Sequence, residues 1–512
     1  MRALLGYEAA ALKRGDKVRV EWDFNKVMNP HILIAGASGA GKTHTIRDLI
    51  SGLSSSTRPG QRVRFHVFDV AGDMMIPGAS TLLFSERTSF GINPLRIDPD
   101  PDFGGVRRRV QSFIRTLNKV STLNLGVKQE ACLRNILFDV YAIFGFRQDD
   151  PETWFVDESQ SHLISDGSDG RLYIDVSKDE YAKVQALGIA KWDPSKALFW
   201  VRPDQYTGSM AQWPVKRGGR RHPTIRDVLD YARRLLVKSF MGADEEAVTC
   251  LEAFNRAATS YQRKVIQAAR RGEMEWRDET LEAGLEKAAG KAIDAYSAYV
   301  GAIKTGRELD HLMKYDSIDT LKSVCDRLDG MVCAGIFKDR PITFPSGQSI
   351  LRYNLKPLTT EEKRMFVIFR LEELYAQAVQ RGEEQDDVVD VFILDEFGNY
   401  ATVAEDRDNI INVIAREGRK YRACLVCAHQ NPLEFPDGFM SSVATKILLR
   451  VDENYWKQLA TKMRIDERLL AWTTPGKSAA IQIKERGSSK NDWSWAVTPS
   501  HADALPQGRR AA

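Results

Sequence analysis

Short apolar runs, separated by segments whose apolar residues recur at helical spacing, dominate the first and last thirds of the chain. Apolar runs of about four to eight residues predict strands buried on both faces, which show no alternation. Such runs are 31–35, 63–70, 391–394, 423–428 and 446–450, and 18–22, 349–355 and 479–483 predict further strands. Helices are predicted between them, over 44–50, 104–118, 129–144, 360–380 and 404–417. Strands that alternate with helices predict an α/β fold with a mostly parallel sheet.

The middle of the chain differs in residue composition and in its predicted elements. From about 150 to 222, Trp, Pro, Gly, Ser and Asp become frequent, and only short strand-like pieces appear. From 223 to about 335 the sequence is mostly helical, with Thr224 placed to cap a helix over 225–236. The predicted organisation is a short N-terminal segment 1–30, a first core part 31–149, an inserted irregular and helical subdomain 150–334, a second core part 335–485 and a C-terminal extension 486–512.

The segment between the first buried strand and its helix carries a phosphate-binding loop. Residues 36–43 read G-A-S-G-A-G-K-T and match the pattern G-x-x-x-x-G-K-[ST] at every fixed position. Glycines let successive backbone N–H groups turn toward phosphate oxygens, and the helix N-terminus adds partial positive charge. We expect Lys42 at the β- and γ-phosphates of ATP and the Thr43 hydroxyl at Mg²⁺. The predicted nucleotide-binding residues are Gly36, Ala37, Ser38, Gly39, Ala40, Gly41, Lys42, Thr43 and His44.

A strand in the last third ends in two acids, Asp395 and Glu396, which is the form of a Walker B segment. We predict that Asp395 holds Mg²⁺ and that Glu396 accepts a proton from the attacking water. An ordinary acidic strand end is the alternative. Gln430 follows the strand 423–428 and is a candidate γ-phosphate sensor, because ligands of a parallel sheet bind beyond the carboxyl ends of its strands.

Composition limits the classes of function. The formal net charge of the 512 residues is only +4, so any contact with nucleic acid must come from local patches. The candidate patches are Arg107–Arg109 and the basic cluster 216–222, and a solvated surface is the alternative for both. No apolar run approaches the ~20 residues that span a bilayer, and the N-terminus lacks the apolar stretch of a secretory signal. We therefore expect a cytoplasmic protein without membrane insertion.

The six cysteines are scattered, which suits a reducing compartment. Cys424 and Cys427 form a C-x-x-C, but they fall within a predicted core strand. Residues three apart on a strand point to opposite faces. We interpret both as buried structural cysteines and not as a redox or zinc site.

Together these motifs resemble the HerA/FtsK superfamily of ring-forming P-loop motor ATPases. The matching segments are 36–43, the strand that contains Asp69, I-N-P-L at 92–95, I-L-D-E-F-G-N-Y at 393–400, R-E-G-R-K-Y at 416–421 and A-H-Q-N-P at 428–432. The resemblance covers roughly residues 30–145 and 320–485. It implies a RecA-like ATPase core, a hexameric ring and a nucleotide shared between subunits.

The resemblance also assigns roles near the end of the chain. Arg419 corresponds to an arginine finger that reaches the γ-phosphate of the neighbouring subunit, and Gln430 to the residue that senses nucleotide state; Arg416 and Lys420 are less secure candidates. Without the family, Arg419 is a surface arginine that complements a helix dipole. Gly418 beside it is predicted to take the positive φ of a helix C-cap.

The implied function is an ATP-driven translocase or helicase on double-stranded DNA, working with a nuclease or a sirtuin-like effector in DNA repair or phage defence. HerA proteins usually carry a β-barrel domain ahead of the P-loop, whereas here only about thirty residues precede the first buried strand. Two alternatives stay open. One is a type IV secretion or conjugation ATPase, and the other is a nucleotide-gated scaffold for a partner enzyme.

Overall fold

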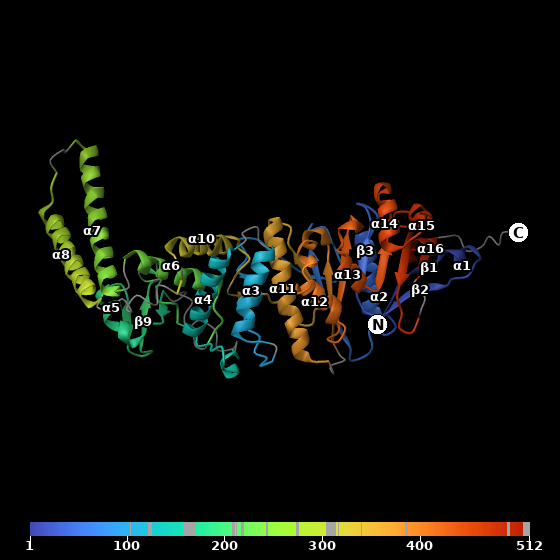
Figure 1. Cartoon of the computed structure of the whole chain (residues 1–512), viewed down its shortest axis with the longest axis horizontal. Coiled ribbons are helices and arrows are strands. Elements are labelled where there is room, and N and C mark those ends of the chain that lie inside the picture. The colour runs from blue at the N-terminus through green and yellow to red at the C-terminus, as the bar shows by residue number, and fades with distance from the viewer. Residues whose placement is uncertain are drawn as a thin grey trace. The chain divides into compact units, whose positions relative to one another are not determined.

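The computed structural model describes residues 1–504 with the exception of 103, 121–124, 157–169, 207–209, 211, 217–219, 242–243, 273–275, 304–313, 316, 339, 384–387 and 489–491. The chain divides into two compact units (Figure 1). Unit 1 comprises 1–93, 115–124 and 334–512, and unit 2 comprises 94–114 and 125–333. None of the helices described has the length and apolar character needed to cross a membrane.

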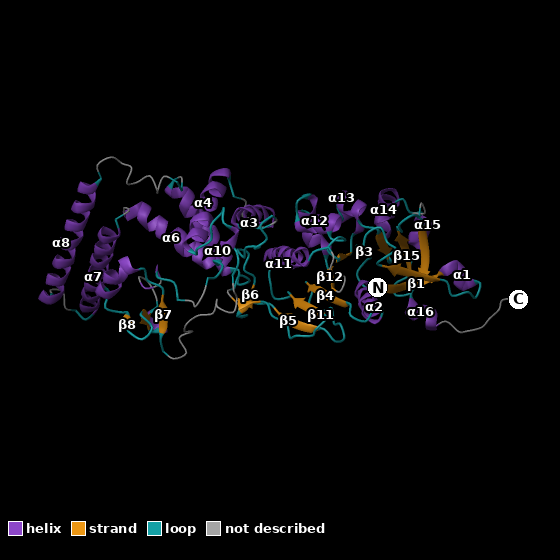
Figure 2. Ribbon diagram, turned by 90° about the horizontal axis from the view of Figure 1, so that it is seen from below, coloured by secondary structure: helices purple, strands orange, loops and turns teal. Residues whose placement is uncertain are grey.

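Unit 1 is built on one eleven-stranded sheet (Figure 2). Seven neighbouring strands of the described chain run parallel, so the loops that follow them meet at one edge of the sheet. This arrangement confirms the predicted α/β fold with a mostly parallel sheet. In order across the sheet they are β14 (Thr445–Leu448), β3 (Ile32–Ala35), β13 (Ala423–His429), β12 (Val388–Leu394), β4 (Arg62–Asp69), β11 (Ile350–Asn354) and β5 (Ser80–Leu83).

Both ends of the chain extend this sheet with antiparallel strands. β15 (Ser478–Ile483) pairs with β14, and β16 (Trp493–Val497) lies between β15 and β1 (Arg2–Glu8). β2 (Arg19–Asp23) forms the outer edge, where the alternating pattern of 18–22 buries Trp22 completely. The segments 1–30 and 486–512, which the sequence separates from the core, thus contribute strands to the core sheet.

Helices cover both faces of the sheet. On one face α2 (Lys42–Ser55) buries a stripe that includes Ile46, Leu49 and Leu53 against apolar side chains of the central strands. On the other face α11 (Thr360–Arg381) sends Phe366 into an aromatic cluster, with ring centroids 4.4 Å from Phe84 and 6.0 Å from Tyr353. Fully burying aromatic and aliphatic side chains of this kind contributes about 1.5–3 kcal/mol each. The predicted capping box of Thr359 with Glu362 is present at the start of α11.

Shorter elements complete unit 1. A two-stranded sheet joins β6 to β10, and most of the small helices lie in the last quarter of the chain. Their bounds are α1 (Ala9–Lys13), β6 (Phe90–Gly91), β10 (Arg340–Pro341), α12 (Ile410–Glu417), α13 (Asp437–Ser442), α14 (Trp456–Met463), α15 (Glu467–Trp472) and α16 (Pro499–Ala504).

Two local predictions in the last third need correction. The helix predicted over 404–417 begins only at Ile410, because the Asn409 side chain accepts a hydrogen bond from Ile411 N and caps it there. Gly418 has φ of −53° and not the positive φ that we predicted. A glycine is nevertheless required there, since a Cβ would lie 2.5 Å from Ile414 O. The cysteines follow the prediction: Cys424 and Cys427 are buried in β13, and burial raises the pKa of both thiols.

Unit 2 has its own small sheet and a set of helices. The three strands β7-β9-β8 enclose a separate core around Phe199 and Trp213. Thr224 caps α6 as predicted, because its hydroxyl accepts from Asp227 N and its N–H donates to the Asp227 carboxylate. The elements are β7 (Leu172–Ile174), α5 (Tyr181–Ala186), β8 (Lys191–Asp193), β9 (Leu198–Val201), α4 (Val127–Ile143), α6 (Ile225–Met241), α7 (Glu245–Arg270), α8 (Glu279–Ala302) and α10 (Ile318–Cys333), while α3 (Val106–Val120) crosses the boundary between the units.

The compact unit begins well before the predicted insertion boundary at 150. α4 packs against α6 and α10, so residues 125–149 join the helical unit and not the core part 31–149 in which the sequence places them. Within the predicted helical part 223–335, α7 and α8 are separate helices among the described residues, since Gly272 takes φ of +84° after α7 and the Asp278 side chain caps α8.

Candidate active site

The predicted phosphate loop joins β3 to α2 and is anchored to the two strands that flank β3. Gly36 N donates to His429 O at the end of β13 (3.2 Å), and Ala37 N donates to Arg450 O just after β14 (2.7 Å). These bonds fix the start of the loop, and within it Ala40 N donates to Ala37 O (3.1 Å). The loop therefore opens at the carboxyl edge of the parallel strands, where α/β proteins bind ligands.

Glycine is required in this loop for two different reasons. At Gly36 a Cβ would lie 2.8 Å from the Leu449 Cβ, so no larger residue fits between the strands. Gly39 and Gly41 have φ of +74° and +103°, a conformation that L side chains rarely adopt. Gly41 is also the residue directly before α2, so its conformation aims the first helical N–H groups into the loop.

Lys42 points back over the loop. Its Nζ donates to Gly36 O at 2.9 Å and to Ala37 O at 3.3 Å. Burial lowers the pKa of Lys42, and the neighbouring carboxylates of Glu396, Asp395 and Asp73 partly offset that effect. The predicted Walker A lysine and both Walker B acids thus share one electrostatic environment.

Asp395 lies at the end of β12, beside the end of β4, and its side chain is buried. Burial is the main cause that raises the pKa of Asp395 to about 7, and the charges of Glu396, Asp69 and Asp73 add to it. One carboxylate oxygen each from Asp69, Asp73 and Asp395 lies within 4.8 Å of the others. Such a set of oxygen donors fits a hard cation such as Mg²⁺.

The three acids are not equivalent. Asp69 is held by Arg352, whose Nε lies 2.9 Å from Asp69 Oδ2, and its other oxygen accepts from Gly72 N at 2.6 Å. Asp73 is exposed and Asp395 is buried, so these two have the capacity left for a cation. The sequence prediction of a metal site named Asp395 and Thr43 and missed Asp73. The available signal was its position four residues after the acid that ends β4.

Glu396 adopts a left-handed backbone conformation, with φ of +53°. A non-glycine residue in this region costs of order 1–3 kcal/mol and is commonly found at functional sites. Its side chain is hydrogen-bonded to the predicted γ-phosphate sensor: Gln430 Nε2 donates to Glu396 Oε1 at 3.0 Å. The structure thus brings the predicted base and the predicted sensor together.

His429, which sequence reasoning passed over, links the Walker B turn to the loop after β13. Gly398 N donates to His429 Nδ1 at 3.2 Å, so the ring proton is assigned to Nε2, which lies 2.7 Å from Glu434 Oε2. His429 Nδ1 is also 3.7 Å from Glu396 Oε2. A Cβ on Gly398 would lie 2.4 Å from the imidazole, which explains the glycine in the D-E-F-G sequence.

Arg419 lies at the amino ends of the parallel strands, opposite to the carboxyl ends where the phosphate loop lies. It precedes β13, whereas Glu396 and Gln430 follow β12 and β13, and its Nη1 donates to Met28 O before β3. Six residue steps along β13 at about 3.3 Å each separate the two edges by ~20 Å. The guanidinium is therefore not part of the site formed by its own chain.

The basic clusters are partly committed to local structure. Arg221 forms a bidentate ion pair with Asp227, in which Nη1 lies 2.6 Å from Oδ2 and Nη2 lies 2.7 Å from Oδ1. Arg220 donates to Thr153 O at 2.7 Å. Lys216 pairs with Asp175 at 2.7 Å, and 217–219 lie outside the described residues. Of the other cluster, Arg107 is exposed on α3. Lys216, Arg220 and Arg221 thus take part in contacts within unit 2.

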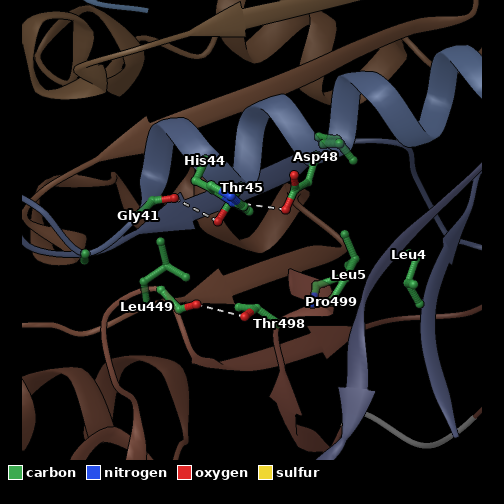
Figure 3. A pocket seen from close by; sticks show the side chains of 12 residues that line it. Leu4, Leu5, Gly41, His44, Thr45, Asp48, Leu449, Thr498 and Pro499 are labelled. Atoms are coloured by element: carbon green, nitrogen blue, oxygen red, sulfur yellow. Dashed lines mark hydrogen bonds and ion pairs between the residues drawn. The ribbon is translucent and has the colours of Figure 1, made fainter. Parts of the chain in front are cut away.

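A groove runs along the first turns of α2, on the side of the loop that bears Gly41 (Figure 3). It holds about 440 Å³ of space that is continuous with solvent. It is lined by β1, the phosphate loop, α2, the residue after β14, the turn before β15 and the segment where β16 leads into α16. Its lining residues are Leu4, Leu5, Ala40, Gly41, His44, Thr45, Asp48, Leu49, Leu449, Gly476, Thr498 and Pro499.

A family model described as FtsK/SpoIIIE matches residues 11–75, which include the phosphate loop. Among solved structures, the chain is similar to VirB4 of Thermoanaerobacter pseudethanolicus, with a TM-score of 0.51 and 14% identity over 98% of this chain and 97% of that one. A looser likeness is to plasmid coupling protein TrwB in complex with GDPNP, with a TM-score of 0.44 and 10% identity over 97% and 94%. No curated protein matches the sequence.

The match to the FtsK/SpoIIIE model confirms, over the residues that it covers, the family resemblance that the motifs indicated. The likeness to VirB4 confirms the RecA-like P-loop fold, and at 14% identity it speaks for the fold alone. The TrwB likeness is too loose to add to the argument. The roles of individual residues rest on the geometry of this chain.

Proposed function

We propose that this chain binds ATP and Mg²⁺ and hydrolyses ATP as a ring-forming motor, with each active site shared between two copies. The observation that most directly supports hydrolysis is the bond of 3.0 Å between Gln430 and Glu396 beside the Lys42 loop. A general base must be oriented within hydrogen-bond reach of the water it activates. An amide that holds this carboxylate at the edge where phosphate would bind fits that requirement.

The residues take the following roles in this proposal. Backbone N–H groups of 36–43 bind the phosphates, and Lys42 turns from the loop carbonyls to the β- and γ-phosphates. Glu396 accepts the proton of the attacking water, while Gln430 orients that carboxylate and senses the γ-phosphate. Asp395, Asp73 and the Thr43 hydroxyl would hold Mg²⁺, which supplies positive charge to the transferred phosphoryl group.

Arg419 is proposed to act on the nucleotide of a second copy. At ~20 Å from the phosphate edge of its own sheet it cannot reach its own nucleotide, and its side chain donates only to a main-chain carbonyl among the described residues. That bond is easily exchanged for a charge-assisted one to phosphate. An arginine finger supplied in trans is typically worth 10³-fold or more in rate.

The proposed track is double-stranded DNA, gripped through backbone phosphates without sequence reading. Exposed Arg107 on α3 is a candidate contact for the proposal, and a nuclease or sirtuin-like effector remains an expected partner from the family resemblance. The alternative is a secretion or conjugation ATPase. It stays open because the family resemblance includes such ATPases as well.

The test of the shared site mixes two inactive variants. Arg419→Ala retains an intact P-loop and Lys42→Ala retains the arginine, so mixed assemblies contain interfaces with all residues present. We expect each variant alone to hydrolyse ATP at less than about one-hundredth of the wild-type rate, and mixtures to regain activity that peaks near equal amounts. Lys26→Ala, at an exposed cation that also lies before β3, is the matched control and should keep wild-type turnover.

Absence of recovery at every mixing ratio, with both variants folded and assembled, would refute the shared site. Adding double-stranded DNA to the wild type then separates the two kinds of motor. Stimulated ATP hydrolysis that weakens as salt rises supports a DNA translocase. An ATP hydrolysis rate that does not change when DNA is added favours the secretion-type alternative.

A further inference from the structure

One side of α7 in unit 2 carries a basic stripe. Arg256, Arg263 and Arg270 follow one another at intervals of seven residues, which is close to two helical turns, so they line up along the helix. Ser260 and Gln267 lie between them at helical spacing, and all five side chains are exposed. At about 1.5 Å per residue, the basic stripe is ~21 Å long.

The basic stripe faces away from α8, the helix that packs along α7 (Figure 1). The Tyr261 hydroxyl donates to Glu282 of α8 at 2.7 Å, and the Tyr261 ring centroid lies 6.2 Å from that of Trp276. Ala268, two turns further along α7, is buried. These contacts mark the side of α7 that meets α8. Successive helical residues are rotated by about 100°, so Arg263 lies about 160° around the helix from Tyr261.

The positive charge of the basic stripe is not neutralised by neighbouring acids. From 253 to 272 the sequence contains five Lys and Arg residues and no Asp or Glu. Among the described residues, Arg263 and Arg270 form no ion pair, and Arg256 Nε donates to a main-chain oxygen, Glu252 O, at 3.3 Å. Arg221, by contrast, is held by the Asp227 carboxylate. A row of cations without local partners attracts a polyanion.

The residue types favour nucleic acid over other acidic partners. A helix that lies on a membrane needs a broad apolar face, and a protein interface needs an apolar core, whereas the basic stripe consists of Arg, Ser and Gln. These are residue types that contact the phosphate oxygens of DNA.

The form of the surface favours a duplex over a single strand. Single strands bind where bases stack on aromatic side chains, but Phe254 and Tyr261 lie seven residues apart on the side of α7 that meets α8. The major groove of B-DNA admits an α-helix, whereas that of double-stranded RNA is too narrow for side chains to read. Double-stranded DNA is therefore the polyanion that fits best.

We propose that α7 binds the phosphate backbone of double-stranded DNA through Arg256, Arg263 and Arg270. This inference rests on the proposed function for its ligand, the DNA track, and it assigns a contact with that track to unit 2. Phosphate contacts carry no sequence information, so the basic stripe holds any segment of the duplex equally well.

The test measures binding of a short fluorescent DNA duplex to the full chain by anisotropy, without ATP and over a range of salt concentrations. The double variant Arg263→Gln, Arg270→Gln removes two cations, and glutamine preserves α7 because its helix propensity is close to that of arginine. The matched control is Lys287→Gln, Lys291→Gln, which removes the same charge from exposed positions of α8.

We expect the Arg263, Arg270 variant to bind the duplex about tenfold or more weakly, and the slope of log affinity against log salt to fall by about 2, because each phosphate contact contributes about 0.9. The α8 control should stay within about twofold of the wild type, since screening weakens the effect of charges outside the contact.

Four results would overturn the proposal: a wild type that does not bind the duplex, an unchanged affinity of the Arg263, Arg270 variant, equal losses in both double variants, or tighter binding of a single strand than of the duplex. An acidic membrane as the real ligand would appear as loss of binding to phosphatidylserine vesicles with duplex binding retained. The failure of the proposed function has a different signature, because the wild type would then hydrolyse no ATP. If only the basic stripe fails, ATP hydrolysis without DNA and its recovery in the mixed variants stay as expected.

Discussion

Replacing Asp395 by Asn tests the electrostatics of the site before any nucleotide is added. Burial and the nearby acids raise the pKa of Asp395 from 3.8 to about 7. A group whose pKa is raised on folding binds more protons in the folded state than in the unfolded state. The stability of the cation-free protein should therefore fall as pH rises from about 4 to about 7, and stay low above that.

The magnitude follows from the shift. Each pKa unit corresponds to 1.36 kcal/mol, so a shift from 3.8 to about 7 implies that ionised Asp395 costs the folded state about 4 kcal/mol at pH 8. Asparagine has nearly the same shape and no charge. The variant in EDTA should therefore be more stable than the wild type at pH 8, and near pH 4 the difference should largely disappear.

Thermal unfolding in EDTA across this pH range measures the effect. One kcal/mol moves the Tm of a domain of 150–250 residues by about 2–4 °C and that of a larger unit by less, so we expect the variant to unfold several degrees higher at pH 8. Mg²⁺ should raise the Tm of the wild type and not of the variant. Asp437→Asn, at a carboxylate that is 85% exposed, is the matched control. A gap between variant and wild type that stayed constant from pH 4 to pH 8 would refute the reasoning.

Two further predictions concern the Walker B turn. Glu396→Gln keeps the bond partner of Gln430 but cannot accept a proton, so it should bind ATP normally and turn over at least about 100-fold more slowly in a steady-state ATPase assay; near-normal turnover would remove Glu396 as the base. Gly398→Ala places a Cβ 2.4 Å from the His429 ring and must displace His429 or the turn, which typically costs about 1–3 kcal/mol. We expect kcat to fall more than ATP affinity, whereas Gly438→Ala, with open space around its Cβ, should match the wild type; an unchanged kcat for Gly398→Ala would show that His429 does not position this turn.

Much of the parallel core could be predicted from the sequence, because strands buried on both faces are continuous apolar runs. The phosphate loop, the acids that end β12 and Gln430 after β13 are local motifs, and topology then brings them to one edge of the sheet. Asp73 could not be assigned in the same way. It follows a turn, and only the pairing of β4 with β12 brings it to Asp395.

The outer parts of the sheet were harder to predict for a physical reason. β1 and β16 pair with each other although nearly the whole chain lies between them, and no local pattern encodes such a partner. The boundary of unit 2 depends on the packing of α4 against α6 and α10. The apolar stripe of α4 shows that this helix packs on one face, but it does not identify the helices against which it packs. Gly418 could not be interpreted correctly from local sequence either. A glycine is needed there because the backbone passes close to Ile414 O, and not because the residue takes a positive φ.

The positions of Arg419 and the phosphate loop also restrict how copies of the proposed motor could associate. In a two-fold dimer the same patch faces itself, so a guanidinium and a phosphate loop that complete each other must both belong to one patch. Here they lie at opposite edges of one sheet, ~20 Å apart. Head-to-tail contact, in which the Arg419 end of one copy's strands meets the loop end of the next copy's strands, brings the two together in the proposed motor. Such contacts leave one end of each kind open until the assembly closes on itself, so every site of the proposed motor is complete in a closed ring.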